Sequence, residues 1–124
     1  MITQEQFKTD FEDFVKSLKD ILFKKNNDYT GNNSDPFFNL RRAERIGLPA
    51  WKGTLIRLLD KMARLETFAS KQEFKVDGEN FEDTIKDAAN YLFLVLELYK
   101  EQYDKSQINQ STKNSNRHSD INRE

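Results

Sequence analysis

Apolar residues recur at intervals of three or four along most of this chain, and no segment alternates apolar and polar residues as a strand does. Because an α-helix turns once in about 3.6 residues, this spacing predicts an all-α fold. The length of 124 residues suits one domain with a modest core. We expect a four-helix bundle in residues 1–103, with room for an extra short helix, and a flexible polar tail in residues 104–124.

The first helix is expected over residues 4–25. Thr3 and Gln6 stand at capping-box spacing, and one apolar stripe behind them should pack in the core. The members of the stripe are Phe7, Phe11, Phe14, Val15, Leu18, Ile21 and Leu22. Residues 26–35 are rich in Asn, Asp, Gly and Ser and predict a loop. Its Tyr29 either folds back onto the core or stacks on the base or sugar of a ligand.

Three further helices are expected downstream. Asp35 and Pro36 suit the N-cap and first position of a short helix over residues 37–46, which Gly47 ends. The next helix covers residues 49–70, and a connector leads to Asn80, the N-cap of the last helix. That helix is apolar on all sides around residues 93–95. A chain this small cannot bury such a helix alone, so we expect a homo-oligomer, a dimer or higher.

Composition narrows the chemistry that the chain can perform. There are no cysteines, and the single histidine, His118, lies in the tail, so Cys- or His-based metal sites are not expected. A cation would need oxygen ligands, which favours Mg²⁺, with Mn²⁺ as the alternative. The net charge of −1, with both signs interleaved, argues against direct DNA or RNA binding and against a membrane surface. No apolar run nears the ~20 residues of a membrane span, so we expect a cytoplasmic protein.

Three polar residues share one face of the last predicted helix: Asp83, Asp87 and Asn90 are spaced by four and three positions. Helix capping accounts for Asp83 but not for Asp87, which lies one turn deeper. One explanation is a solvated face. The other is a cation site: if the last two long helices pack antiparallel, Asp60 would join the two aspartates around Mg²⁺.

Basic residues near these acids point to phosphate as the anionic part of a ligand. Lys61 and Arg64 follow Asp60 on the same predicted helix and would balance the negative charge of a bound phosphate. The short helix presents three arginines, Arg41, Arg42 and Arg45. They either contact phosphate groups or form a solvated face paired with Glu44.

Three segments, taken in order, resemble the nucleotide-modification-associated domain family of phages and bacteria: DYTGNNSDPFFNLRRAE, GTLIRLLDKMARLE and FEDTIKDAANYLFLVLELY. More distantly they resemble the all-α pyrophosphohydrolases of the MazG and dimeric dUTPase kind. The resemblance covers roughly residues 21–103. The pieces that carry it are Asp28-Tyr29, Asp35-Pro36-Phe37 with Asn39, Asp60-Lys61, Arg64-Leu65, Glu82-Asp83, Asp87 and Asn90-Tyr91.

The resemblance implies a MazG-like helical bundle that binds or acts on nucleotides. In MazG-like enzymes, acidic residues hold Mg²⁺ against a triphosphate, and attack by water releases pyrophosphate and a nucleoside monophosphate. Carried onto this chain, Asp60, Asp83 and Asp87 would be the metal ligands and catalytic residues, with Glu66 a weaker candidate. The residues expected to contact the nucleotide are Tyr29, Phe38, Asn39, Arg41, Lys61, Arg64, Asn90 and Tyr91.

The chain departs from the MazG pattern of ExxE followed by ExxD. Its earlier helix offers Asp60 followed by two basic residues, and its later helix reads DxxxD. Two functions therefore compete: a Mg²⁺-dependent (deoxy)nucleoside triphosphate pyrophosphohydrolase, and a phage-encoded sponge that binds a nucleotide or cyclic-nucleotide signal of host defence in the host cytoplasm. A third interpretation, a helical oligomerisation protein without a ligand site, explains the apolar last helix but not the Asp83 and Asp87 stripe.

Overall fold

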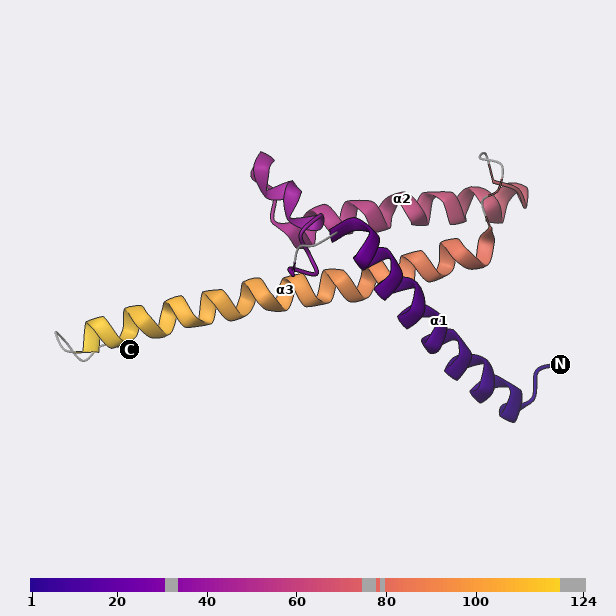
Figure 1. Cartoon of the computed structure of the whole chain (residues 1–124), viewed down its shortest axis with the longest axis horizontal. Coiled ribbons are helices and arrows are strands. Elements are labelled where there is room, and N and C mark those ends of the chain that lie inside the picture. Colours follow the sequence, from indigo (N-terminus) through magenta and orange to yellow (C-terminus); the bar gives the residue numbers. More distant parts are fainter. Residues whose placement is uncertain (31–33, 75–77, 79, 119–124) are drawn as a thin grey trace.

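The computed structural model describes residues 1–30, 34–74, 78 and 80–118, with side chains at all of these except 28–30 and 105–118. This part of the chain is all-α, as predicted, and contains four helices and no strand. They are α1 (Gln4–Thr30), the 3₁₀ helix η1 (Leu40–Ile46), α2 (Ala50–Lys71) and α3 (Phe81–His118). None of the helices in these ranges is long and apolar enough to cross a membrane. Figure 1 shows α2 and α3 side by side and antiparallel, with α1 crossing α3.

The hairpin of α2 and α3 forms the packed body of the molecule. Its buried residues are small or medium-sized: Ala50, Thr54 and Leu58 on α2, and Thr84, Ala88, Asn90 and Leu98 on α3. Small side chains let the two backbones approach closely. At the turn, the ring of Phe68 stacks on those of Phe74 and Phe81, at centroid distances of 4.9 and 4.8 Å. These aromatic contacts close the end of the hairpin.

Most of the predicted helix boundaries are present. Thr3 Oγ1 accepts the N–H of Gln6 at 3.1 Å, and Asn80 Oδ1 accepts the N–H of Asp83 at 3.2 Å, so both predicted N-caps are confirmed. Gly47 ends η1 with a φ of 78°, a left-handed conformation that favours glycine. The short helix differs from the prediction, because residues 36–39 form a turn and only Leu40–Ile46 is helical, with 3₁₀ geometry.

Two helices are longer than the sequence predicts. α1 continues to Thr30 instead of ending at residue 25, and its last turns are held by side-chain contacts of Lys25 and Asn26. α3 continues through residues 104–118, part of the segment predicted to be a flexible polar tail. That segment contains no proline or glycine, so nothing in it forces the helix to end. Residues 119–124 lie outside the described chain.

The N-terminal half of α1 is not buried in a single chain. Phe7, Phe11 and Val15 are 62, 64 and 46% exposed, so the prediction that the whole stripe packs in the core is wrong for this half. Among the elements described here, α1 packs only on α3, through its C-terminal half. Figure 1 shows the N-terminal half projecting away from the hairpin, in agreement with the exposure of these three side chains.

Candidate functional site

A cleft lies where the C-terminal half of α1, residues 36–40, α2 and α3 meet. Its enclosed space is about 70 Å³, and the rest of the hollow is open to solvent. It is thus a shallow cleft, smaller than the roughly 300–1,000 Å³ that is common for small-molecule pockets. The lining residues are Leu22, Lys25, Asn26, Pro36, Asn39, Leu40, Arg57, Asp87, Asn90, Tyr91 and Leu94. Leucine, proline and tyrosine walls thus surround a small set of charged and amide groups.

Asp87 sits between two lysines that come from different helices. Lys25 Nζ on α1 donates to its Oδ1 at 2.6 Å, and Lys61 Nζ on α2 lies 3.5 Å from its Oδ2. The side chains of Asp87 and Lys61 are only 17 and 22% exposed, whereas that of Lys25 is 45% exposed. Both carboxylate oxygens are therefore engaged by ammonium groups. The two ion pairs join α1, α2 and α3 at the floor of the cleft.

Positive charge exceeds negative charge at this floor. Arg57 lines the cleft, and it has no ion-pair partner among the residues that the structure describes. With Lys25 and Lys61, which pair with Asp87, it brings the cations at this cleft to three against one carboxylate. A site with an excess of cations attracts anions, and the partly buried Lys61 is screened less by water than the exposed Arg57 is.

Amide side chains shape the cleft, although most are already used. Asn90 is buried, and its Nδ2 donates to the carbonyl of Leu18 at 3.1 Å, which ties α3 to α1. Asn26 Nδ2 donates to the carbonyl of Pro36 at 2.6 Å and ties α1 to the segment before η1. Asn39 stands at the N-cap position of η1 but makes no capping hydrogen bond through its side chain. It is one of the residues that line the cleft.

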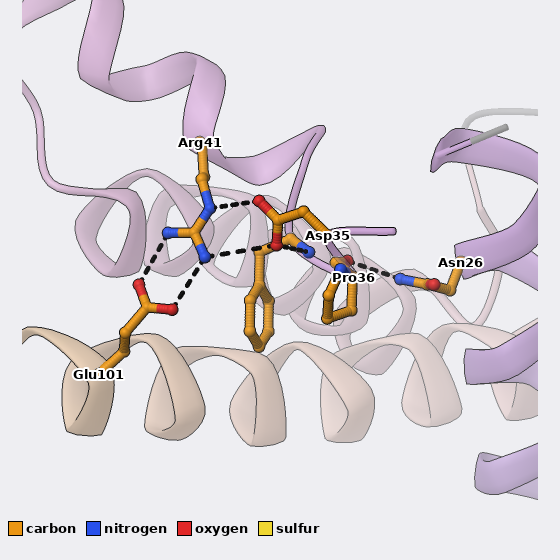
Figure 2. A network of polar contacts seen from close by, with 6 residues as sticks. Asn26, Asp35, Pro36, Arg41 and Glu101 are labelled. Carbon is orange, nitrogen blue, oxygen red and sulfur yellow. Dashed lines mark hydrogen bonds and ion pairs between the residues drawn. The ribbon is translucent and has the colours of Figure 1, made fainter. Parts of the chain in front are cut away.

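The segment that carries Pro36 and Asn39 is held by an arginine between two acids (Figure 2). Arg41 donates from Nε to Asp35 Oδ2 at 2.6 Å, and its two terminal nitrogens donate to the Glu101 oxygens at 2.7 and 2.8 Å. The hydrogen bond from Arg41 holds the pKa of Asp35 below its usual value. The same contacts, with Glu101 first, raise the pKa of Arg41. This network fastens the wall of the cleft to α3.

The three carboxylates predicted to hold Mg²⁺ are not gathered. Asp60 pairs with Arg64 at 3.2 Å on the surface of α2, and Asp83 is exposed in the first turn of α3. Asp87 forms ion pairs with Lys25 and Lys61. Within the described part of the chain, no three acidic or histidine side chains form a group that could hold a metal ion. The donor set therefore does not fit Mg²⁺ in a single chain.

The predicted nucleotide contacts divide into two groups. Asn39, Asn90 and Tyr91 line the cleft, with Lys61 directly behind Asp87. The others lie elsewhere: Arg64 pairs with Asp60, Phe38 and Arg41 line a separate hollow on the outer side of η1 with Arg42 and Arg45, and the side chain of Tyr29 lies outside the described residues. Arg41 moreover pairs with two acids, Asp35 and Glu101.

Several residues of the cleft were not predicted from the sequence, above all Lys25, Arg57 and the apolar walls. The sequence does contain a feature that could have identified Lys25 as a site residue. Lys25 follows Leu18 and Leu22 at helical spacing, so it occupies a position of the apolar stripe of α1 where a charge is unusual. Arg57 carries no such signal, because it stands among other charged residues on α2.

Comparison of this chain with protein-family models, with curated proteins and with solved structures finds no match. The resemblance to the phage family and to MazG-like enzymes therefore rests on the quoted residues alone.

Proposed function

We propose that this chain binds a nucleotide or a closely related phosphorylated small molecule in the cleft between α1, η1, α2 and α3. The observation that carries the proposal is the surplus of cations there: Lys25 and Lys61 pair with the one carboxylate of Asp87, and Arg57 lines the same cleft. Phosphate groups suit such a floor, since guanidinium and ammonium groups bind them through charge-assisted hydrogen bonds.

The walls of the cleft suit the remainder of a nucleotide. Tyr91, Leu40 and Leu94 provide apolar surface on which a base could lie, and Asn39 provides an amide that can donate and accept. An incoming phosphate would compete with Asp87 for Lys25, the more exposed of its two lysines. Binding would then exchange one anion for another at the same ammonium group, with little loss of charge pairing.

The proposal favours binding without hydrolysis. The carboxylates that a MazG-like reaction would use are spread over the surface or paired with lysines, and this donor set does not fit Mg²⁺. The same proposal includes a more specific fold and role for the chain: a MazG-like bundle of phage type that acts as a nucleotide sponge in the cytoplasm of the host. It is supported by the quoted sequence segments and by the antiparallel pairing of α2 and α3. Pyrophosphohydrolysis is the competing function.

A nucleotide panel measured by calorimetry, once in EDTA and once in Mg²⁺, separates these functions. The panel should include mono-, di- and triphosphates and cyclic mono- and dinucleotides. We expect at least one member to bind in EDTA and to be recovered chemically intact. Release of pyrophosphate only in Mg²⁺ would favour the hydrolase, and no binding by any member in either buffer would contradict the proposal.

A further inference from the structure

The enclosed part of the cleft has the size of a single phosphate group. It measures about 70 Å³, and the rest of the hollow is open to solvent. Each water-sized group needs roughly 10–15 Å³ of such space, so the enclosed part holds on the order of five of them. A phosphate group, with one phosphorus and four oxygens, is of this size. A base or a chain of three phosphates is larger and would extend into the open part.

The charge at the cleft matches the same group in its fully ionised form. Lys25, Lys61 and Arg57 carry three positive charges and Asp87 one negative charge, so the four side chains sum to +2. Among the described residues that line the cleft, no other is charged. At pH 7 a phosphate monoester carries about −1.5 to −2, whereas a diester carries about −1. A monoester therefore balances the cleft, and a diester leaves about one positive charge uncompensated.

A phosphate can reach the cleft cations without leaving Asp87 alone. Lys25 Nζ lies 2.6 Å and Lys61 Nζ 3.5 Å from the carboxylate, and the side chain of Lys25 is 45% exposed against 22% for Lys61. Lys25 can therefore turn to an incoming phosphate oxygen while Lys61 keeps Asp87 paired. This arrangement avoids the main cost of breaking a buried ion pair, which is a carboxylate left without a cation.

The apolar wall lies at the distance that one phosphate and one sugar cover. Asp87, Tyr91 and Leu94 all line the cleft from α3, four and three residues apart. With a rise of 1.5 Å per residue, Tyr91 and Leu94 lie about 6 and 10 Å along the helix from Asp87. A phosphate beside Asp87, followed by one sugar, places a base against these two side chains. Two more phosphates between them would carry the base beyond this wall.

We propose that the cleft selects a nucleoside monophosphate, a nucleotide with one terminal phosphate monoester, over nucleoside triphosphates and over cyclic or other phosphodiesters. Selection of this kind rests on the binding function proposed above and names its ligand class. The phosphate occupies the enclosed part beside Lys25, and the base lies against Tyr91 and Leu94. The cations of the chain itself supply the positive charge that Mg²⁺ supplies where triphosphates are bound.

Calorimetry in EDTA at neutral pH tests the selection with matched ligands. The common ribo- and deoxyribonucleoside 5′-monophosphates are each compared with their own phosphate methyl ester, cyclic monophosphate and triphosphate. The methyl ester is the sharpest control, because it keeps the base and sugar and removes one negative charge. We expect the best monophosphate to bind at least about 10-fold more tightly than its methyl ester, its cyclic form and its triphosphate.

The outcomes separate this selection from the binding function on which it rests. Equal or tighter binding of the methyl ester, the cyclic form or the triphosphate would overturn the selection and leave nucleotide binding standing. No binding by any of these ligands would overturn both.

A charge variant tests the selection from the side of the protein. Arg57→Gln lowers the summed charge of the cleft from +2 to +1, and Arg42→Gln removes an arginine that lines a different hollow. Both arginines are exposed, so both variants should keep the helical circular dichroism of the wild type. We expect the preference for monophosphate over methyl ester to fall to a few-fold in Arg57→Gln and to persist in Arg42→Gln. An unchanged preference in Arg57→Gln would overturn the proposal.

Discussion

Replacing Arg41 by alanine should lower the free energy of unfolding by about 2–3 kcal/mol. Arg41 makes one short bond to Asp35 at 2.6 Å and a two-pronged pair to Glu101 at 2.7 and 2.8 Å. Such charge-assisted hydrogen bonds contribute about 1.5–3 kcal/mol each when well shielded. The side chains of all three residues are about a quarter to a third exposed, so solvent screening reduces each pair to roughly 1 kcal/mol or a little more.

Urea unfolding followed by circular dichroism measures the effect, with Arg42→Ala as the matched control. Arg42 is an exposed neighbour with no ion pair to any described residue, and its loss should change stability by no more than about 0.5 kcal/mol. All variants are compared at one protein concentration, because the apparent stability of any chain that self-associates depends on its concentration. The melting temperature should fall by roughly 10 °C in Arg41→Ala.

The same variant should also weaken ligand binding, since the network fastens the segment that carries Pro36 and Asn39 to α3. The reasoning fails if Arg41→Ala and Arg42→Ala unfold at the same urea concentration. In that case the pairs with Asp35 and Glu101 contribute no more than ordinary surface ion pairs.

Three further outcomes are expected. The hydrogen bond from Arg41 lowers the pKa of Asp35 in the folded chain. The stability that this carboxylate contributes is therefore present above the pKa of the unfolded carboxyl and is lost as pH falls through the lower folded value. The difference in melting temperature between wild type and Asp35→Asn should shrink as the pH of the measurement is lowered toward about 3. Gly53→Ala would place its Cβ 2.6 Å from that of Ala43 and should cost about 1–3 kcal/mol in urea unfolding, most of it recovered by adding Ala43→Gly; an unchanged midpoint would contradict the close packing of η1 on α2. Lys61→Met should weaken nucleotide binding by on the order of 10-fold in calorimetry, and equal affinity would remove this lysine from the site.

Much of the fold follows from local patterns that a single sequence displays. The caps at Thr3 and Asn80 and the left-handed Gly47 are local features, and the structure contains each of them. The ends of α1 and α3 were harder to predict. α1 passes through a polar segment because contacts of Lys25 and Asn26 with distant residues hold it, and such contacts have no signature in composition.

The candidate site could be predicted only in part, for a similar reason. Spacing identified Asp87 and Asn90 as unusual, and both lie at the cleft. Spacing alone cannot say which partner reaches a carboxylate across the fold. Asp87 meets lysines from α1 and α2, whereas Asp60 turns to Arg64 on its own helix, so the acids that looked like one metal site are separate.

The most direct test of the cleft is the affinity of two glutamine variants for the tightest-binding nucleotide, measured by calorimetry in EDTA. Arg57 lines the cleft without an ion-pair partner among the described residues, and Arg42 lies outside the cleft on the outer side of η1. Binding at the cleft predicts that Arg57→Gln loses at least about 10-fold in affinity while Arg42→Gln binds as the wild type does. Equal binding by Arg57→Gln and the wild type, or a loss confined to Arg42→Gln, would contradict it.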